Sequence, residues 1–346
     1  MESIVTARSE GGVHERNAAI RNHEVRRRVS ALTAYAVVVE APARSDFRQL
    51  ELTPPGPEDV VVEIDYSGIS TGTERLLWSG TMPPFPGMGY PLVPGYESIG
   101  RIVSAGPKSG RREGQFVFVP GARCYGEIRG LFGGAASRIV IPGRRTSTIH
   151  EGLAERGVLL ALAATAYHVL RTPEGGLCIP ELIVGHGVLG RLLARLAVAL
   201  GDSPPVVWEI DSQRTGGAQG YEVTTVEQDT RTDYRTICDV SGASDVLDTL
   251  IARLAPGGEV VLGGFYTRPL QFSFPPAFMR EARMRVAAEW QPDDLDAVQA
   301  LVMDGRLSLD GLITDCRNAE QADAAYRTAF DDPACLKMVL DWRSIH

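Results

Sequence analysis

The chain has 346 residues, of which 44% are hydrophobic and 23% charged, and its formal net charge at pH 7 is −8. This length exceeds what one hydrophobic core usually supports, so the composition predicts a globular protein of two domains. The negative charge argues against a nucleic-acid-binding surface, which would need a basic patch. The five cysteines are scattered without a Cys-x-x-Cys pair, which argues against a disulfide framework or a zinc knuckle and favours the cytoplasm.

The first thirty residues alternate arginines with glutamates and contain few large apolar side chains. This pattern predicts a disordered or loosely helical extension over residues 1–30 and lacks the apolar core of a signal peptide. The longest apolar run, residues 158–170, is too short to span a bilayer and predicts a buried helix. We therefore expect no transmembrane segment.

Short strands separated by Gly and Pro are predicted across residues 31–150. They fall at residues 34–40, 59–66, 98–105, 115–120 and 136–141. No helical periodicity lasts beyond a turn or two. This part of the chain is predicted to form a small, irregular, β-rich domain.

Strands and helices alternate in residues 151–289, after a helix at 151–170. Strands are expected at 182–184, 206–208, 237–240, 259–263 and 285–290, helices at 189–200 and 246–254, and a turn at 256–258. This order predicts an α/β domain with a doubly wound parallel sheet, the Rossmann fold. Helices at 293–304 and 319–331 and a strand at 336–341 then return, within residues 290–346, to the first domain.

A glycine-rich turn follows the apolar strand at residues 182–184. Gly185, Gly187 and Gly190 have the G-x-G-x-x-G spacing of a dinucleotide-binding turn. In such a turn the first glycine permits the bend, the second admits a pyrophosphate, and the third lets the helix pack on the strand. The alternative is a tight βαβ turn without a ligand. The predicted cofactor-binding residues are Gly185, His186, Gly187, Val188, Leu189, Gly190, Glu209, Ser241 and Gly263.

Glu209 indicates which dinucleotide is expected. It ends the strand at 206–208, 24 residues after Gly185, near the spacing of the acid that binds the adenosine ribose. Its charge and that of Asp211 would repel a 2′-phosphate, and the next arginine is Arg214. The sequence thus favours NAD over NADP. His186 could point toward the cofactor phosphates or lie on the surface, while His168 is expected to be a packing residue without a paired acid.

The order of these segments resembles that of the medium-chain dehydrogenases, over about residues 32–343. The resemblance lies in residues 67–74 (SGISTGTE), 91–100 (PLVPGYESIG) and 254–264 (LAPGGEVVLGG). It implies a GroES-like fold for the first domain. Zinc-containing members bind their catalytic metal through Cys and His at the first two segments, where this chain has Ser70 and Tyr96. The third position offers only Ala163 and Ala164, and the four-cysteine lobe is missing. We therefore predict no metal.

Longer strings resemble the bacteriochlorophyllide a dehydrogenases of photosynthetic bacteria. They span residues 78–98, 119–138, 182–196 and 274–283. The resemblance implies NAD-dependent oxidation of the ring A hydroxyethyl group of a bacteriochlorophyllide to an acetyl group, in bacteriochlorophyll a synthesis. The substrate would be a flat, apolar macrocycle with a carboxylate tail.

Without zinc, a side chain must polarise or deprotonate the alcohol. Our hypothesis places Tyr96, Glu97, Ser70 and Thr73 in that catalytic cluster; the alternative is that they only bond loops together. The predicted substrate-binding residues are Trp78, Phe85, Met88, Tyr90, Phe265 and Tyr266. The candidates for binding the carboxylate are Arg75, Arg123 and Arg129.

Two other functions remain open at this stage. One is a zinc-free quinone or enone reductase that uses NADPH, against which Glu209 argues. The other is a pigment-binding carrier that keeps the fold without turnover. The sequence leaves the oligomeric state open, with a homodimer as the candidate.

Overall fold

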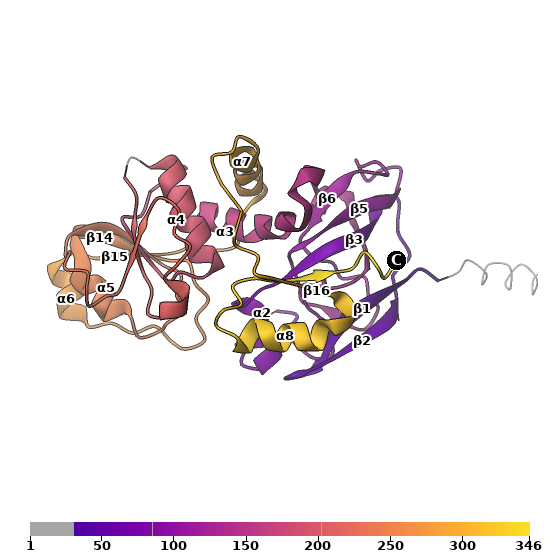
Figure 1. The fold of residues 1–346 in the computed structure, drawn as a ribbon, viewed down its shortest axis with the longest axis horizontal. Coiled ribbons are helices and arrows are strands. Elements are labelled where there is room, and N and C mark those ends of the chain that lie inside the picture. Colours follow the sequence, from indigo (N-terminus) through magenta and orange to yellow (C-terminus); the bar gives the residue numbers. More distant parts are fainter. Residues whose placement is uncertain (1–30, 85, 202) are drawn as a thin grey trace, which may run out of the picture.

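The computed structural model describes residues 31–84, 86–201 and 203–346. The extension predicted for residues 1–30, and Phe85, lie outside the described residues. The chain forms two lobes joined by helical segments, with the N-terminal strands in one lobe and the glycine-rich turn in the other (Figure 1).

The first lobe is built from two sheets. One has the order β16-β17-β3-β5-β6-β9, with β8 also paired to β3, and the other has the order β2-β1-β4-β7. The bounds are β1 Thr33–Ala41, β2 Arg44–Glu51, β3 Asp59–Ile69, β4 Leu92–Val93, β5 Ser98–Ala105, β6 Phe116–Val119, β7 Arg129–Gly130, β8 Arg138–Pro142, β9 Ser147–Thr148, β16 Asp315–Asn318 and β17 Met338–Asp341. The central strand β3 buries residues on both faces, which makes it the middle of this lobe's core.

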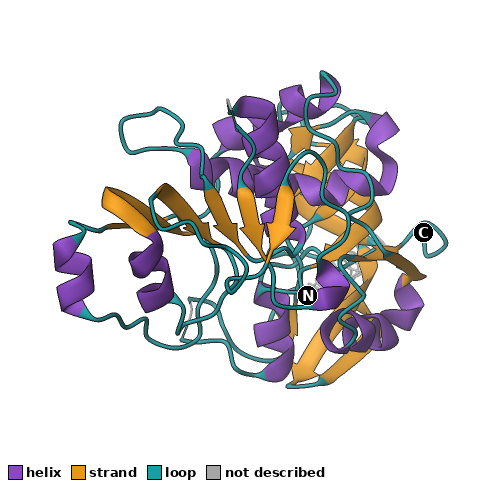
Figure 2. Ribbon diagram, turned by 60° about the vertical axis from the view of Figure 1, so that its left-hand side comes forward, coloured by secondary structure: helices purple, strands orange, loops and turns teal. Residues whose placement is uncertain are grey.

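The second lobe contains six parallel strands in the order β12-β11-β10-β13-β14-β15. Helices cover the sheet on both sides (Figure 2). The bounds are β10 Leu182–Val184, α4 Val188–Leu200, β11 Val206–Trp208, β12 Glu222–Thr224, β13 Tyr234–Asp239, α5 Leu247–Arg253, β14 Leu254–Leu262, α6 Phe274–Met279 and β15 Arg283–Val286. The prediction of a doubly wound parallel sheet is confirmed, and the strand order reverses beside β10, where ligands bind in such folds.

The C-terminal elements contact both lobes. Helix α7 (Pro292–Met303) packs against α3 (Leu160–Leu170). Strand β17 then pairs antiparallel with the end of β3, and α8 (Ala322–Asp331) lies along the first lobe (Figure 1). Because β17 adjoins β3 at residues 66–69, the end of the chain reaches the segment that carries Ser70.

Several predicted elements differ in the structure. The strand expected at 285–290 is β15, Arg283–Val286, and the helix expected at 319–331 begins with a 3₁₀ turn, Ala319–Gln321, before α8. The turn expected at residues 256–258 lies inside β14, where Gly257 has φ +74° and the register shifts against β13, so the glycines form an irregularity within a strand. The helix expected at 151–170 is divided into a 3₁₀ segment, Glu151–Leu159, with non-helical dihedrals at Ala154, and α3.

The segment Glu151–Leu170 also raises the question of whether the chain crosses a membrane. Among the described residues, one helical stretch, Glu151–Leu170, is long and apolar enough to cross a membrane, and 61% of its most apolar window is buried inside the protein. Core helices commonly have this composition. The elements that were not expected from the sequence are strands β2, β4, β7, β9, β12 and β16 and the short helices α2 (Thr73–Ser79) and α6.

Candidate active site

The glycine-rich turn has the geometry that a dinucleotide phosphate requires. Gly185 has φ +102°, which favours glycine. A Cβ on Gly190 would overlap the carbonyl oxygen of Gly185, so α4 can approach β10 only with glycine there. A Cβ on Gly187 would meet nothing within 4 Å. The turn therefore leaves open space beside Gly187, at the start of α4, where Val188 and Leu189 also lie and free N–H groups can bind an anion.

Glu209 lies directly against this turn. One carboxylate oxygen accepts a hydrogen bond from the amide of His186 at 3.0 Å, and the other accepts from the amides of Ile210 and Asp211 at 2.8 and 2.9 Å. The side chain is fixed at the end of β11 before any ligand arrives. This arrangement fits a carboxylate that binds ribose hydroxyls.

The side chain of His186 does not lie on the surface, which excludes one of the two alternatives. It is fully buried, with Nδ1 2.6 Å from the carbonyl oxygen of Arg214 and Nε2 2.8 Å from the hydroxyl of Tyr221. Burial lowers the pKa of His186 to about 4, so the ring is neutral near pH 7. Both ring nitrogens have protein partners, so the imidazole is not free to bind the cofactor phosphates. Only the backbone of His186 can face them.

On the other side of the switch point, which is the proposed cofactor crevice, Asp239 organises the residues at the end of β13; the sequence analysis missed it. Its carboxylate accepts hydrogen bonds from the amide and hydroxyl of Ser241, at 2.9 and 2.6 Å, and from the hydroxyl of Tyr266 at 2.8 Å. Its carbonyl oxygen accepts from the amide of Gly263 at 2.9 Å. Burial raises the pKa of Asp239. Three predicted residues, Ser241, Gly263 and Tyr266, are thus brought together, and a Cβ on Gly185 would contact Ser241.

The structure also brings the predicted catalytic residues together. The hydroxyl of Tyr96 donates to Ser70 Oγ at 2.6 Å and also bonds the side chain of Thr73. Burial, and next the charge of Glu97, raise the pKa of Tyr96 above its ordinary value, so the phenol stays neutral. Tyr96 is therefore available as a hydrogen-bonding group and not as a phenolate.

Glu97 forms an ion pair with Lys337, a residue that the sequence analysis did not single out. Glu97 is 0% exposed and Lys337 is 1% exposed. Burial raises the pKa of Glu97, and the ammonium of Lys337 opposes this shift. A Cβ on Gly68 would overlap the carboxylate, so glycine at this position of β3 makes room for the pair.

A second buried carboxyl, Glu74, lies beside this pair and was also missed. One oxygen accepts from the amide of Ser70 at 3.2 Å, and the other accepts from the hydroxyl of Tyr326 at 2.9 Å. Burial raises the pKa of Glu74 to about 8, and the negative charge of Glu97 adds to the shift. Glu74 is therefore mainly protonated at neutral pH.

The predicted substrate-binding residues fall on both lobes. Trp78 is 7% exposed and its ring stacks on Tyr326, so it belongs to the core of the first lobe. Met88 and Tyr90 are half-buried against the same core. Phe265 is 41% exposed on the second lobe, close in sequence to Tyr266.

The three candidate arginines are all exposed. Arg129 donates to the carbonyl of Tyr90 at 3.4 Å, and Arg123 lies near Gly87. Both therefore flank the loop that carries Met88, whereas Arg75 lies on α2.

His168 has an acidic partner, contrary to our expectation. Its Nδ1 lies 2.8 Å from Asp294, which also pairs with Arg171. This contact joins α3 to α7. At the positions where zinc members have ligands, the chain presents Ser70, Tyr96, Ala163 and Ala164, and the described residues contain no group of three or more His, Cys, Asp or Glu side chains that could hold a metal.

A GroES-like sheet domain followed by a Rossmann domain defines the class of medium-chain alcohol dehydrogenases. Residues 56–151 match the family model of the alcohol dehydrogenase GroES-like domain. The fold is also similar to that of an alcohol dehydrogenase from Escherichia coli CFT073 solved in complex with NADH, with a TM-score of 0.74 and 19% identity over 89% of this chain and 99% of that one.

Within this class the similarity is much closer to one group. The chain is 57% identical over 308 residues to the 2-desacetyl-2-hydroxyethyl bacteriochlorophyllide A dehydrogenase of Rhodobacter capsulatus, and 55% identical over 316 residues to that of Cereibacter sphaeroides. Each alignment covers 89% of this chain and 98% of the relative. The chain belongs to the bacteriochlorophyllide A dehydrogenase family, as its sequence strings predicted.

The two later glycines of the turn should respond differently to alanine. Gly187→Ala should fold normally, because its Cβ meets open space, but should weaken dinucleotide binding by about tenfold or more, equivalent to about 1.4 kcal/mol. Gly190→Ala should lower the free energy of unfolding by about 1–3 kcal/mol through overlap with Gly185. Thermal unfolding and NADH fluorescence titration measure the two effects. Equal binding by Gly187→Ala and the parent protein would contradict the assignment of this turn.

Proposed function

We propose that this chain is an NAD-dependent dehydrogenase that oxidises the ring A hydroxyethyl group of a bacteriochlorophyllide to an acetyl group in bacteriochlorophyll a synthesis. The observation that carries the proposal is the near full-length similarity to the two bacteriochlorophyllide A dehydrogenases. The polar cluster around Ser70 and Tyr96 supports it, because an alcohol substrate needs a group that polarises its hydroxyl.

The residues of the crevice fit NAD. The open space beside Gly187 would accept the pyrophosphate, and the fixed carboxylate of Glu209 would bind the ribose hydroxyls. A 2′-phosphate would meet the charges of Glu209 and Asp211, which supports NAD over NADP. Ser241 and Gly263 would line the crevice at the ends of β13 and β14. When bound, NAD supplies the hydride acceptor.

This chain's own residues would manage the hydroxyl proton. Tyr96, Ser70 and Thr73 form one hydrogen-bonded group, in which Tyr96 and Thr73 keep partial exposure and can contact a substrate. Glu97 and Lys337 would contribute a fixed charge pair behind them. Since hydroxyl and phenol groups are poor zinc ligands compared with thiolate and imidazole, we propose that this group acts without a metal.

The macrocycle would lie between the two lobes. We propose that Met88 and Tyr90 on one side, and Phe265 and Tyr266 on the other, contact its apolar faces. Trp78 would support the first wall from within the core. Arg123 and Arg129, which flank the loop of Met88, are the arginines placed to bind its carboxylate, and comparing the free acid with its methyl ester tests this role.

Two features bear on assembly and compartment. Strand β15 lies at the edge of the parallel sheet, and its Met284 and Val286 are 37% and 74% exposed. We propose this edge as the contact of a homodimer. Measuring the molar mass in solution tests this proposal. The five free cysteines support a cytoplasmic location.

The direct test mixes the purified protein with hydroxyethyl bacteriochlorophyllide and either NAD or NADP. We expect NADH absorbance and a red shift of the pigment with NAD, and a much lower kcat/KM with NADP because of Glu209. A preference for NADPH with quinones or enones would favour the reductase instead. A pigment shift on binding that does not change when NAD is added would indicate a carrier.

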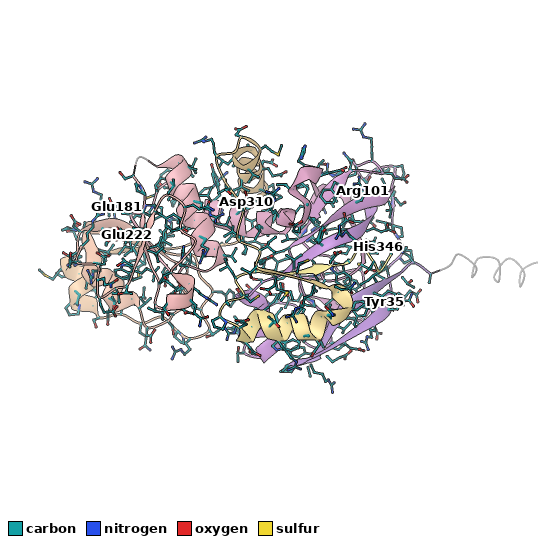
Figure 3. The ribbon with its side chains drawn as sticks, viewed as in Figure 1. Tyr35, Arg101, Glu181, Glu222, Asp310 and His346 are labelled. Carbon is teal, nitrogen blue, oxygen red and sulfur yellow. The ribbon has the colours of Figure 1, made fainter. Side chains whose placement is uncertain are left out.

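Tyr96→Phe removes the hydroxyl that bonds Ser70. We expect turnover to fall by about tenfold to ten-thousandfold, the range that proton-transfer groups contribute. Tyr35→Phe is the matched control, because Tyr35 is 40% exposed on β1 in the first lobe (Figure 3). Full turnover by Tyr96→Phe, measured as NADH formation, would remove Tyr96 from the catalytic group.

A further inference from the structure

We infer that Glu74, rather than Glu97, takes up the proton that the alcohol loses, and that Ser70 passes it on. This inference rests on the proposed dehydrogenation, because it concerns the fate of the proton released in that reaction. Glu74 contacts the amide of Ser70, so it would act through Ser70 as a positioning and proton-storing residue.

Glu74 is connected to the proposed reacting group through Ser70. The Ser70 amide donates to Glu74 at 3.2 Å, while Ser70 Oγ accepts from Tyr96 at 2.6 Å. The amide contact holds the carboxyl of Glu74 next to Ser70, and the relay that we infer requires the Ser70 hydroxyl to turn toward that carboxyl by rotation about its Cα–Cβ bond. Ser70 is 4% exposed and Glu74 is 1% exposed, so bulk water has little access to this junction.

The charges of the cluster distinguish the two carboxyls. Glu97 is paired with Lys337, and Gly68 leaves just enough room for that pair. Glu74 receives hydrogen bonds from the Ser70 amide and the Tyr326 hydroxyl, and none of the described cations forms an ion pair with it. Two buried carboxyls share one ammonium, so the carboxyl without a cation is the one that can gain and lose a proton near neutral pH.

The proton step balances with Glu74 as the acceptor. The O–H bond of the alcohol breaks, and its electron pair forms the second bond of the new carbonyl. The hydrogen of the carbinol carbon leaves with its two electrons to the nicotinamide. The Tyr96 hydroxyl takes the alcohol proton as its own proton passes to Ser70 Oγ, and the Ser70 proton passes to the carboxylate of Glu74, which becomes a carboxylic acid.

The groups that face Glu74 define the pH dependence. Burial and the negative charge of Glu97 raise the pKa of Glu74, whereas the Tyr326 hydroxyl, Lys337 and the Ser70 amide lower it, and the result is about 8. The carboxylate, which is the accepting form, is populated above that pH. Turnover should therefore rise with pH up to about 8 and then level off.

The test measures kcat against pH, from 6 to 10, with hydroxyethyl bacteriochlorophyllide and NAD. Below pH 8 the parent protein should gain close to tenfold per pH unit, as expected for one titrating acceptor. Glu74→Gln keeps the size of the side chain but cannot take up a proton, so its profile should be flat and its kcat lower above pH 8. A rise in Glu74→Gln like that of the parent would overturn the inference.

Tyr326→Phe provides a readout that a purely structural role would not give. Phenylalanine keeps the ring that stacks on Trp78 but removes the hydrogen bond that lowers the pKa of Glu74. The rise in kcat should therefore move to higher pH. An unmoved midpoint would count against Glu74. Glu222→Gln is the matched control, since Glu222 is exposed on β12 in the other lobe (Figure 3), and its profile should equal that of the parent.

An infrared titration separates this inference from the proposed function. In the parent protein without substrate, a carboxylic acid C=O band should disappear as the pH rises through about 8, and it should be missing in Glu74→Gln. If the parent shows the band but does not oxidise the pigment, the proposed function fails and Glu74 remains a titrating group. If the band is missing between pH 6 and 8, the inference fails even when the pigment is oxidised.

Discussion

The buried pairing of Glu97 with Lys337 is the interaction on which the proposed active site depends. An isolated buried charge is costly, and removing one partner of a buried pair commonly costs about 3–5 kcal/mol. The pair joins the start of β5 to the start of β17, so it connects the N-terminal part of the first lobe to the returning end of the chain. It also leaves Glu74 as the carboxyl without a cation.

The two walls of the crevice are fixed in different ways. On the side of the glycine-rich turn, close backbone packing between Gly185 and Gly190 and the hydrogen bonds of Glu209 determine the geometry. On the other side, hydrogen bonds to Asp239 hold Ser241 and Tyr266. Both walls are formed by the protein alone, so a dinucleotide would bind to a preformed surface.

Local patterns predicted the elements that are continuous in sequence. The strands at 98–105, 182–184 and 206–208 agree with the structure. The last two are short apolar runs, and the first mixes apolar with polar residues and ends before the turn residues Gly106 and Pro107. Strand β2 was missed because its residues are polar and half-exposed. The glycine spacing was informative for a physical reason, since Gly185 has a positive φ, a Cβ on Gly190 would overlap Gly185, and Gly187 borders open space.

The polar cluster could be predicted only in part. Ser70 and Tyr96 were found because they replace metal ligands in two recognisable segments. Lys337 and Tyr326 come from the last part of the chain, and Tyr326 contacts Glu74 across 252 positions. A local sequence pattern cannot predict a contact between residues so far apart in the chain. The acid beside His168 was missed for the same reason, since Asp294 lies on α7.

A metal-free group of hydroxyl and carboxyl side chains is proposed to manage the alcohol proton. Elemental analysis of the purified protein, made on the sample whose turnover has been measured, tests this claim most directly. We predict full activity with far less than one zinc per chain and no loss of activity after treatment with a strong chelator. One zinc per chain, with activity that follows zinc content, would contradict the account.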